Sequence, residues 1–242
     1  IGPLDLYQQL ASAVSSSFLL ESAEHGVWSR YSFIGLGARS EIRFKTTREM
    51  AIANGDRLLP NGSASSGTML ESLESITSAW RQAETEDLPP LASGLVGLIG
   101  WDLIREIENL PVGKQRGYEA PLMHLQLVSE LVVVDHLERN LKIISNIYCD
   151  GTSDLSKSYQ IAVSKIQEIS DLLESSHAES FQEESKSVDA PVSSNLSQTQ
   201  FEAMVEKSKE YVRAGDVFQV VVSQRFDVDI ETSGVDVYRE LR

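Results

Sequence analysis

The chain has 242 residues, 41% hydrophobic and 24% charged, which is ordinary for a globular protein of one or two domains. Its formal net charge of -15 argues against nucleic acid and anionic membranes as main partners, because both favour basic surfaces. The single Cys149 excludes an internal disulfide, and no apolar run approaches the roughly 20 residues of a membrane span. We therefore expect a cytoplasmic protein.

The first ninety residues predict short elements of both kinds. Apolar residues at helical spacing predict helices over 4–14 and 69–81. Asn54-Gly55 between apolar residues is a strong hairpin signal within 50–59. Three short strands, separated by glycines and polar residues, are expected at 17–22, 31–36 and 41–45.

The middle of the chain predicts a strand, a hairpin and a helix. The strand covers 93–101 and contains three glycines, which usually mark a bulge or a close approach of backbones. A hairpin joins 125–134 to 141–147, and His136 lies in its turn, where a hydrogen-bonding role is favoured over metal binding. An amphipathic helix is expected over 155–173.

Residues 174–196 differ in composition from the rest of the chain. Ser, Glu, Lys, Asp and Ala dominate, so this segment cannot bury enough apolar surface to offset the entropy of ordering, and we expect a flexible linker open to proteolysis. The linker separates a first region, 1–173, from a second region, 197–242.

The second region predicts a helix, a strand and the beginning of another helix. A capping box at 197–200 opens the first helix, and Gly215 ends it. The strand covers 217–226, and the last helix begins near 235. Mixed helices and hairpins without a steady strand–helix alternation predict an α+β fold, with antiparallel sheets and helices packed outside.

The strand at 217–226 carries polar side chains that its folding does not require. Both of its faces are largely apolar, so burial on both sides is expected. Gln219 and Ser223 share one face and would then need hydrogen-bond partners. Either neighbouring loops supply these partners, or this face lines a polar ligand cleft.

Three ordered blocks resemble anthranilate synthase component I, a family of chorismate-utilising enzymes. The segment 215–226 (GDVFQVVVSQRF) is similar to the stretch that opens the family's chorismate-binding core. The segments 18–24 (FLLESAE) and 30–35 (RYSFIG) resemble its N-terminal elements. A third block, 94–102 (GLVGLIGWD) followed by Arg105, Glu108 and 110–111 (LP), resembles a further element of the family, and one departure from it is Trp101, where Tyr or Phe is usual.

The resemblance implies a feedback pocket for L-tryptophan. In the family the serine of the LLES element belongs to this pocket, together with the leucine and glutamate before it. These positions are Leu20, Glu21 and Ser22 here. The following block adds weaker candidates for the same pocket, namely Arg30, Tyr31 and Ser32. From the residues alone, the favoured interpretation is that Glu21 and Ser22 end a strand at the surface.

The resemblance also assigns a role to Gln219. Relatives that add water to chorismate carry a lysine base here, whereas those that use ammonia tend to carry glutamine. A glutamine cannot act as a base but can orient a nucleophile or a ring hydroxyl. The family's acid–base histidine, magnesium-binding glutamates and substrate loop correspond to positions beyond Arg242. We therefore expect no metal site and no catalysis from these 242 residues alone.

These observations favour the N-terminal part of an enzyme that converts chorismate and ammonia to anthranilate and pyruvate with Mg²⁺, under inhibition by L-tryptophan. Its expected partner is a glutamine amidotransferase subunit, component II. Two alternatives stay open. One is aminodeoxychorismate synthase component I, although that relative usually reads V-N-L where this chain has Val221-Val222 after Val220. The other is a non-catalytic amino-acid-binding module.

Overall fold

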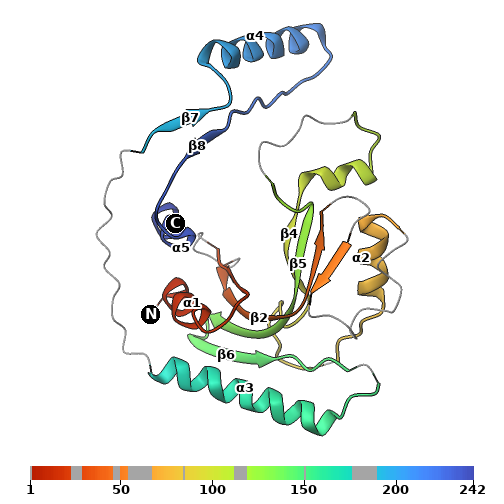
Figure 1. Ribbon diagram of the computed structural model, residues 1–242, viewed down its shortest axis with the longest axis vertical. Coiled ribbons are helices and arrows are strands. Elements are labelled where there is room, and N and C mark those ends of the chain that lie inside the picture. Colours follow the sequence, from red (N-terminus) through yellow and green to blue (C-terminus); the bar gives the residue numbers. More distant parts are fainter. Residues whose placement is uncertain are drawn as a thin grey trace. The chain divides into compact units, whose positions relative to one another are not determined.

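The computed structural model describes residues 2–22, 29–45, 50–53, 67–83, 85–111, 119–149, 151–175 and 190–242. The chain divides into two compact units, Ile1–Ala178 and Glu179–Arg242 (Figure 1). The predicted hairpin turn at Asn54-Gly55 and most of the predicted linker, 176–189, lie outside the described residues.

The first unit is built on two long strands that pair over their whole length. β2 (Tyr31–Phe44) and β5 (Met123–Asp135) run antiparallel at the centre of a six-stranded sheet. Every pairing in this sheet is antiparallel, and the α+β prediction is confirmed. The shorter strands add to the two edges: β1 (Ser17–Leu20) and β3 (Met50–Ala53) pair with β2, and β4 (Leu95–Ile99) and β6 (Asn140–Ser145) pair with β5.

β2 is one strand, whereas the sequence predicted two strands interrupted by glycine. The register shifts between Ala38 and Ser40, so a bulge absorbs the irregularity without ending the strand. Gly37, with φ of 73°, takes the left-handed conformation just before this bulge. Its amide donates to the carbonyl of Ser16 at 2.8 Å, which holds the beginning of β1 beside the bulge.

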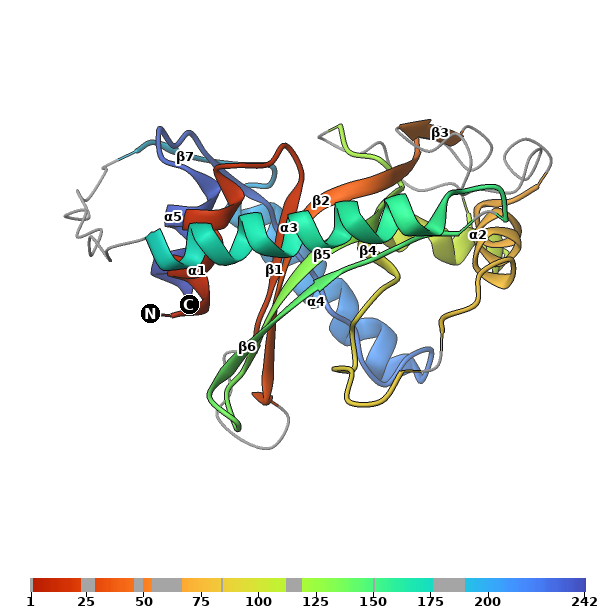
Figure 2. The same ribbon diagram turned by 90° about the horizontal axis from the view of Figure 1, so that it is seen from below.

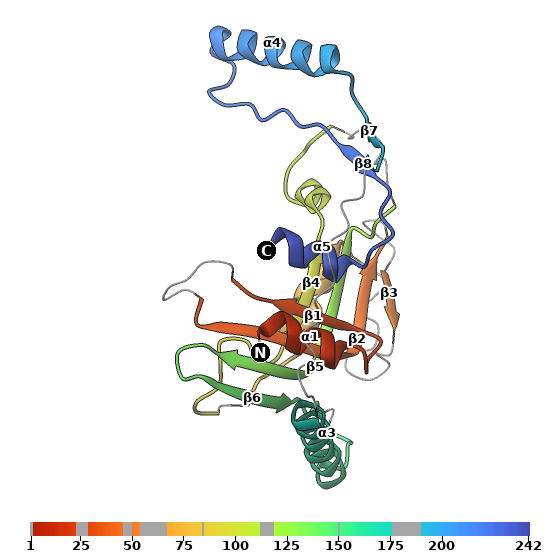
Figure 3. The ribbon, with the colours of Figure 1, turned by 90° about the vertical axis from the view of Figure 1, so that its left-hand side faces the viewer.

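Helices cover the sheet over separate apolar clusters. α1 (Pro3–Ala11) and α3 (Leu155–Ser175) share a cluster with β2, β5 and β6. α3 runs across these strands in Figure 2 and lies beside β6 in Figure 3. α2 (Met69–Ser78) covers the other half of β2 and β5. The residues buried in these two clusters are Leu6, Leu10, Ile34, Leu36, Val132 and Ile169 in the first, and Ile42, Phe44, Met69, Ile76, Met123 and Leu125 in the second.

A third cluster lies on β2 and β5 and includes the aromatic side chains of Phe18, Tyr31 and Phe33. Gly35 is paired with Phe18 across β1 and β2, and the Phe18 ring covers it. A Cβ atom at Gly35 would lie 2.0 Å from the nearest ring atom. The close packing of β1 on β2 therefore requires glycine at this position.

We predict that Gly35→Ala destabilises the protein by about 1–3 kcal/mol, because the packed Phe18 ring has to move. Gly234→Ala is the control, since a Cβ there meets no atom within 4 Å, and its effect should stay within about 0.5 kcal/mol. Denaturant unfolding of both variants measures the difference. Equal stability of the two variants would contradict the packing described here.

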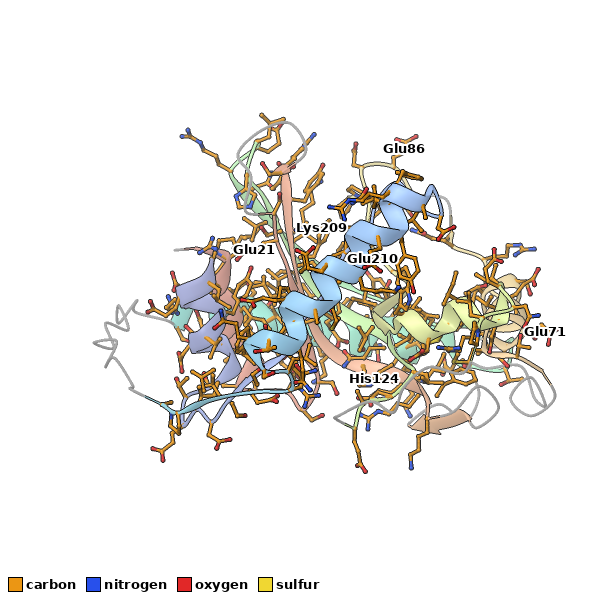
Figure 4. All side chains as sticks on the ribbon, turned by 90° about the horizontal axis from the view of Figure 1, so that it is seen from above. Glu21, Glu71, Glu86, His124, Lys209 and Glu210 are labelled. Carbon is orange, nitrogen blue, oxygen red and sulfur yellow. The ribbon has the colours of Figure 1, made fainter. Side chains whose placement is uncertain are left out.

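The second unit contains α4 (Gln198–Ala214), α5 (Gly234–Leu241) and a two-stranded sheet of β7 (Val192–Ser194) and β8 (Phe226–Val228). The predicted capping box is confirmed: Ser197 Oγ accepts from the Gln200 amide, and the Gln200 side chain accepts from the Ser197 amide. Gly215 ends the helix in the left-handed conformation, as predicted. Lys209 and Glu210 lie on α4 (Figure 4).

The predicted buried strand at 217–226 is wrong for this structure. Only its last residue joins a strand, β8, and residues 217–225 pair with no strand among the described residues. Phe218 is 96% exposed and Val221 80% exposed. A strand needs a neighbour on at least one edge, and here only the short β7 is available, beside 226–228.

Candidate functional site

The register of the sheet gathers the six predicted effector residues at one end. β1 ends at Leu20, which pairs with Phe33, so Glu21 and Ser22 continue toward the beginning of β2. Tyr31, the first residue of β2, pairs with Asp135 at the end of β5. We call this region, comprising the end of β1, the beginning of β2 and the β5–β6 turn, the effector end.

Apolar side chains of the effector end share one face of the sheet. Leu20 and Phe33 are direct partners and therefore project from the same side. The rings of Tyr31 and Phe33 lie 5.9 Å apart with a 37° tilt. Leu20 is 42% exposed, so this group presents apolar surface to solvent. Such a surface suits a flat apolar ligand group.

Glu21 and Ser22 follow this surface directly. Glu21 is half-buried and Ser22 is exposed. Figure 4 shows Glu21 beside the end of β1. Ser22 makes no hydrogen bond to any other residue in the part of the chain that the structure describes. Its hydroxyl and the Glu21 carboxylate offer polar groups next to the apolar side chains.

Arg30 and Asp135 form a bidentate, partly buried ion pair at the effector end. Arg30 Nε donates to both carboxylate oxygens at 3.0 and 3.1 Å, and Arg30 Nη2 donates to Oδ2 at 2.7 Å. The Asp135 side chain is fully buried. The same carboxylate accepts from the backbone amides of Leu137 and Glu138, each at 3.1 Å, and so shapes the β5–β6 turn. The Arg30 guanidinium also lies 4.8 Å from the centre of the Tyr31 ring.

Ser32 also hydrogen-bonds within the protein. It is buried, and its hydroxyl lies 2.8 Å from His136 Nε2. The backbone amide of His136 donates to the Arg30 carbonyl at 2.8 Å. The prediction that His136 is a hydrogen-bonding turn residue is confirmed.

The hydrogen bond from Arg30 holds the pKa of Asp135 at about 2, against the opposing effect of burial. Because the pKa of Asp135 is lower in the folded than in the unfolded chain, its ionised carboxylate stabilises the fold at pH values above the unfolded pKa, near 4. This contribution disappears as the pH falls toward about 2.

We predict that wild type is more stable than Asp135→Asn at neutral pH and that the difference shrinks between about pH 4 and pH 2. Denaturant unfolding across this range measures it. A difference independent of pH would contradict the ionic role of Asp135.

A second polar cluster lies on β2 and β5 away from the effector end. Glu41 is buried and accepts from Ser16 Oγ at 2.7 Å and from Arg43 Nη2 at 2.7 Å. The hydrogen bond from Ser16 is the main cause that lowers the Glu41 pKa. His124, labelled on the strands in Figure 4, accepts from Arg43 Nε at 3.1 Å. The polar groups of these side chains therefore hydrogen-bond to one another.

Charged residues of the block at 94–111 mainly support the fold. Arg105 Nε donates to Asp102 at 3.2 Å, and Arg105 Nη1 donates to the Pro111 carbonyl. Glu106, in the 3₁₀ helix η2 (Trp101–Glu106), accepts from the first two amides of α2, those of Met69 and Leu70, at 3.0 Å each. Its carboxylate therefore caps α2.

Gln219 lies far along the chain, in the second unit. It is exposed within the unpaired residues 217–225, so the expected burial of its face, together with that of Ser223, is wrong here.

Within the described residues, no group of three or more histidine, cysteine or acidic side chains could hold a metal ion. None of the described helices is both long and apolar enough to span a membrane.

A family model described as chorismate binding enzyme matches residues 15–242. The chain belongs to this family. Among its relatives, anthranilate synthase component 1 of Mycolicibacterium smegmatis is 35% identical over 99% of this chain and 45% of its own length. The corresponding protein of Mycobacterium tuberculosis is 33% identical over 99% of this chain and 47% of its own length. This member of the family thus spans less than half the length of these curated relatives.

A solved structure supports the fold of this chorismate binding family member. Anthranilate synthase component I from Streptococcus pneumoniae TIGR4 aligns with a TM-score of 0.67 over 92% of this chain and 47% of that chain, at 19% identity. At this identity the likeness establishes the fold alone.

Sequence reasoning missed the role of Asp135. It placed His136 in the hairpin turn but did not connect the neighbouring Asp135 to Arg30, 105 residues earlier. An acidic residue that ends a run of valines, LVVVD at 131–135, was the available signal, because buried carboxylates need a charged partner. Local sequence could not identify which arginine supplies it.

Proposed function

We propose that the chain is the N-terminal part of an anthranilate synthase component I. The observation that carries this proposal is the match of nearly the whole chain to proteins of that name, within a family of chorismate binding enzymes. The reaction would take chorismate and ammonia to anthranilate, pyruvate and water. Ammonia would come from a glutamine amidotransferase subunit, component II.

Gln219 is the residue of this chain proposed to act on the substrate. Its amide can donate and accept hydrogen bonds and so can orient ammonia or a ring hydroxyl, but it cannot remove a proton. This supports amination of chorismate rather than hydration. Gln219 is exposed among residues 217–225, so a closed substrate site would require these residues to be covered.

Magnesium is proposed for the whole enzyme and not for these residues. The metal would neutralise carboxylates of chorismate when bound. The described residues provide no set of ligands for it, so we assign no step of the reaction through magnesium to this chain.

The effector end is proposed to bind L-tryptophan. Leu20, Tyr31 and Phe33 offer an apolar surface for an indole ring, and Glu21 offers a carboxylate for the ammonium group. Ser22 adds an exposed hydroxyl at the same place. Binding would lower activity through a difference in affinity between two states of the enzyme.

The product of the full-length protein tests the proposed activity. With chorismate, an ammonium salt and Mg²⁺, we expect fluorescent anthranilate and an equal amount of pyruvate. Accumulation of aminodeoxychorismate without pyruvate would favour the aminodeoxychorismate synthase alternative. Binding of tryptophan without consumption of chorismate would instead favour an amino-acid-binding module.

A further inference from the structure

The start of β2 is held by the β5–β6 turn. Asp135 binds the Arg30 side chain, the His136 amide binds the Arg30 carbonyl, and the His136 ring binds the Ser32 hydroxyl. Tyr31 lies between these two anchored residues, and Arg30 also covers its ring. The orientation of Tyr31 therefore depends on two residues of the turn.

The polar side-chain groups of Arg30 and Ser32 already bind other residues of the protein. Two of the three guanidinium nitrogens of Arg30 bind a fully buried carboxylate, which neutralises the arginine charge. The Ser32 hydroxyl is buried against His136. By contrast, Leu20 and Ser22 are exposed at the same end of the sheet.

From this contrast we infer that the six predicted effector residues divide into two groups. Leu20, Ser22 and Tyr31 face the ligand, and Glu21 lies beside them at the end of β1. Arg30 and Ser32 act together with Asp135 and His136 as positioning residues, which fix the beginning of β2 against the end of β1. This inference rests on the proposed tryptophan site and adds Asp135 and His136 to it.

The test uses the full-length enzyme and measures the tryptophan concentration for half-maximal inhibition beside kcat/KM for chorismate without tryptophan. Asp135→Asn and His136→Ala should raise the inhibitory concentration at least tenfold and leave kcat/KM within about twofold. His136→Gln, which keeps a side chain able to donate and accept hydrogen bonds, should restore inhibition to within about threefold of wild type.

A general loss of stability is controlled by Glu106→Gln. This change also removes a carboxylate that holds two elements together, but it does so at α2 instead of the effector end. It should lower the melting temperature and leave the inhibitory concentration unchanged. If Glu106→Gln weakens inhibition as much as Asp135→Asn does, the effect is general destabilisation and the inference is wrong.

A double-mutant cycle separates positioning by Arg30 from direct contact. If Arg30 acts through Asp135, then Arg30→Met, Asp135→Asn and the double variant should raise the inhibitory concentration by the same factor, within about threefold. If the increase in the double variant equals the product of the two single increases, Arg30 binds tryptophan itself, and the inference is overturned.

The outcome with Ser22→Phe distinguishes failure of this inference from failure of the proposed site. If Ser22→Phe abolishes inhibition while the Asp135 and His136 variants are inhibited like wild type, the tryptophan site stands and the positioning role is wrong. If wild type is insensitive to tryptophan, or Ser22→Phe is inhibited normally, the proposed site itself fails.

Discussion

Ser22→Phe in the full-length enzyme is expected to abolish inhibition by L-tryptophan while anthranilate formation continues. The inhibitory concentration should rise at least a hundredfold, and kcat and KM for chorismate should stay within about twofold of wild type. Ser22 lies in the first unit, outside the second unit that carries Gln219, so the change should affect the effector and not the chemistry.

The size of this effect follows from two losses. A phenyl group beside Leu20 and Tyr31 would occupy the space proposed for the indole ring, and the serine hydroxyl would no longer be available to the ligand. Losing a hydrogen bond and adding a clash costs several kcal/mol, and each 1.4 kcal/mol is about a tenfold change in affinity. A hundredfold change requires only about 3 kcal/mol.

Ser15→Phe provides a matched control. Ser15 is an exposed serine near the opposite end of β1, so the same substitution there adds the same apolar surface away from the effector end. Its inhibition curve should coincide with that of wild type. Equal inhibition of Ser22→Phe and wild type would mean that Ser22 is only the end of a strand.

The second large effect concerns the 242 residues by themselves. We expect no anthranilate above a no-protein control from chorismate, ammonium and Mg²⁺, whereas the full-length protein turns over. The described residues hold no metal-binding cluster, and Gln219 lies in an exposed, unpaired segment. Anthranilate formed by the 242 residues alone, and lost on Gln219→Ala, would show that they contain a complete active site.

Elements defined by local sequence were predictable. The helices expected at 69–81 and 155–173 appear as α2 and α3, and the cap at Ser197 and the stop at Gly215 have the expected geometry. In each case, periodic apolar residues or a capping side chain specify the structure within a few neighbouring positions.

Features that depend on distant partners were not predictable. Residues 217–226 have the composition of a buried strand, but a strand forms only where another strand pairs with it. Conversely, β2 continues through a glycine because β5 pairs with it on both sides of the bulge. The Arg30–Asp135 pair joins residues 105 apart, and neither local sequence indicates the other.

The candidate site also combines features that local sequence indicates with features that depend on distant residues. The LLES and RYSFIG segments predicted residues that lie together at one end of the sheet, because β1 and β2 are neighbours in both sequence and space. The proposed separation of ligand-facing from positioning residues needed the structure, since it depends on which side chains the β5–β6 turn binds.

Hydrogen exchange of the full-length protein with and without L-tryptophan tests the central claim most directly. Tryptophan should slow exchange in peptides that cover 17–22, 29–34 and 135–139, the three segments of the effector end. Peptides from α2 should exchange equally in both conditions. Protection confined to other regions, with these three segments unchanged, would contradict a tryptophan site at the effector end.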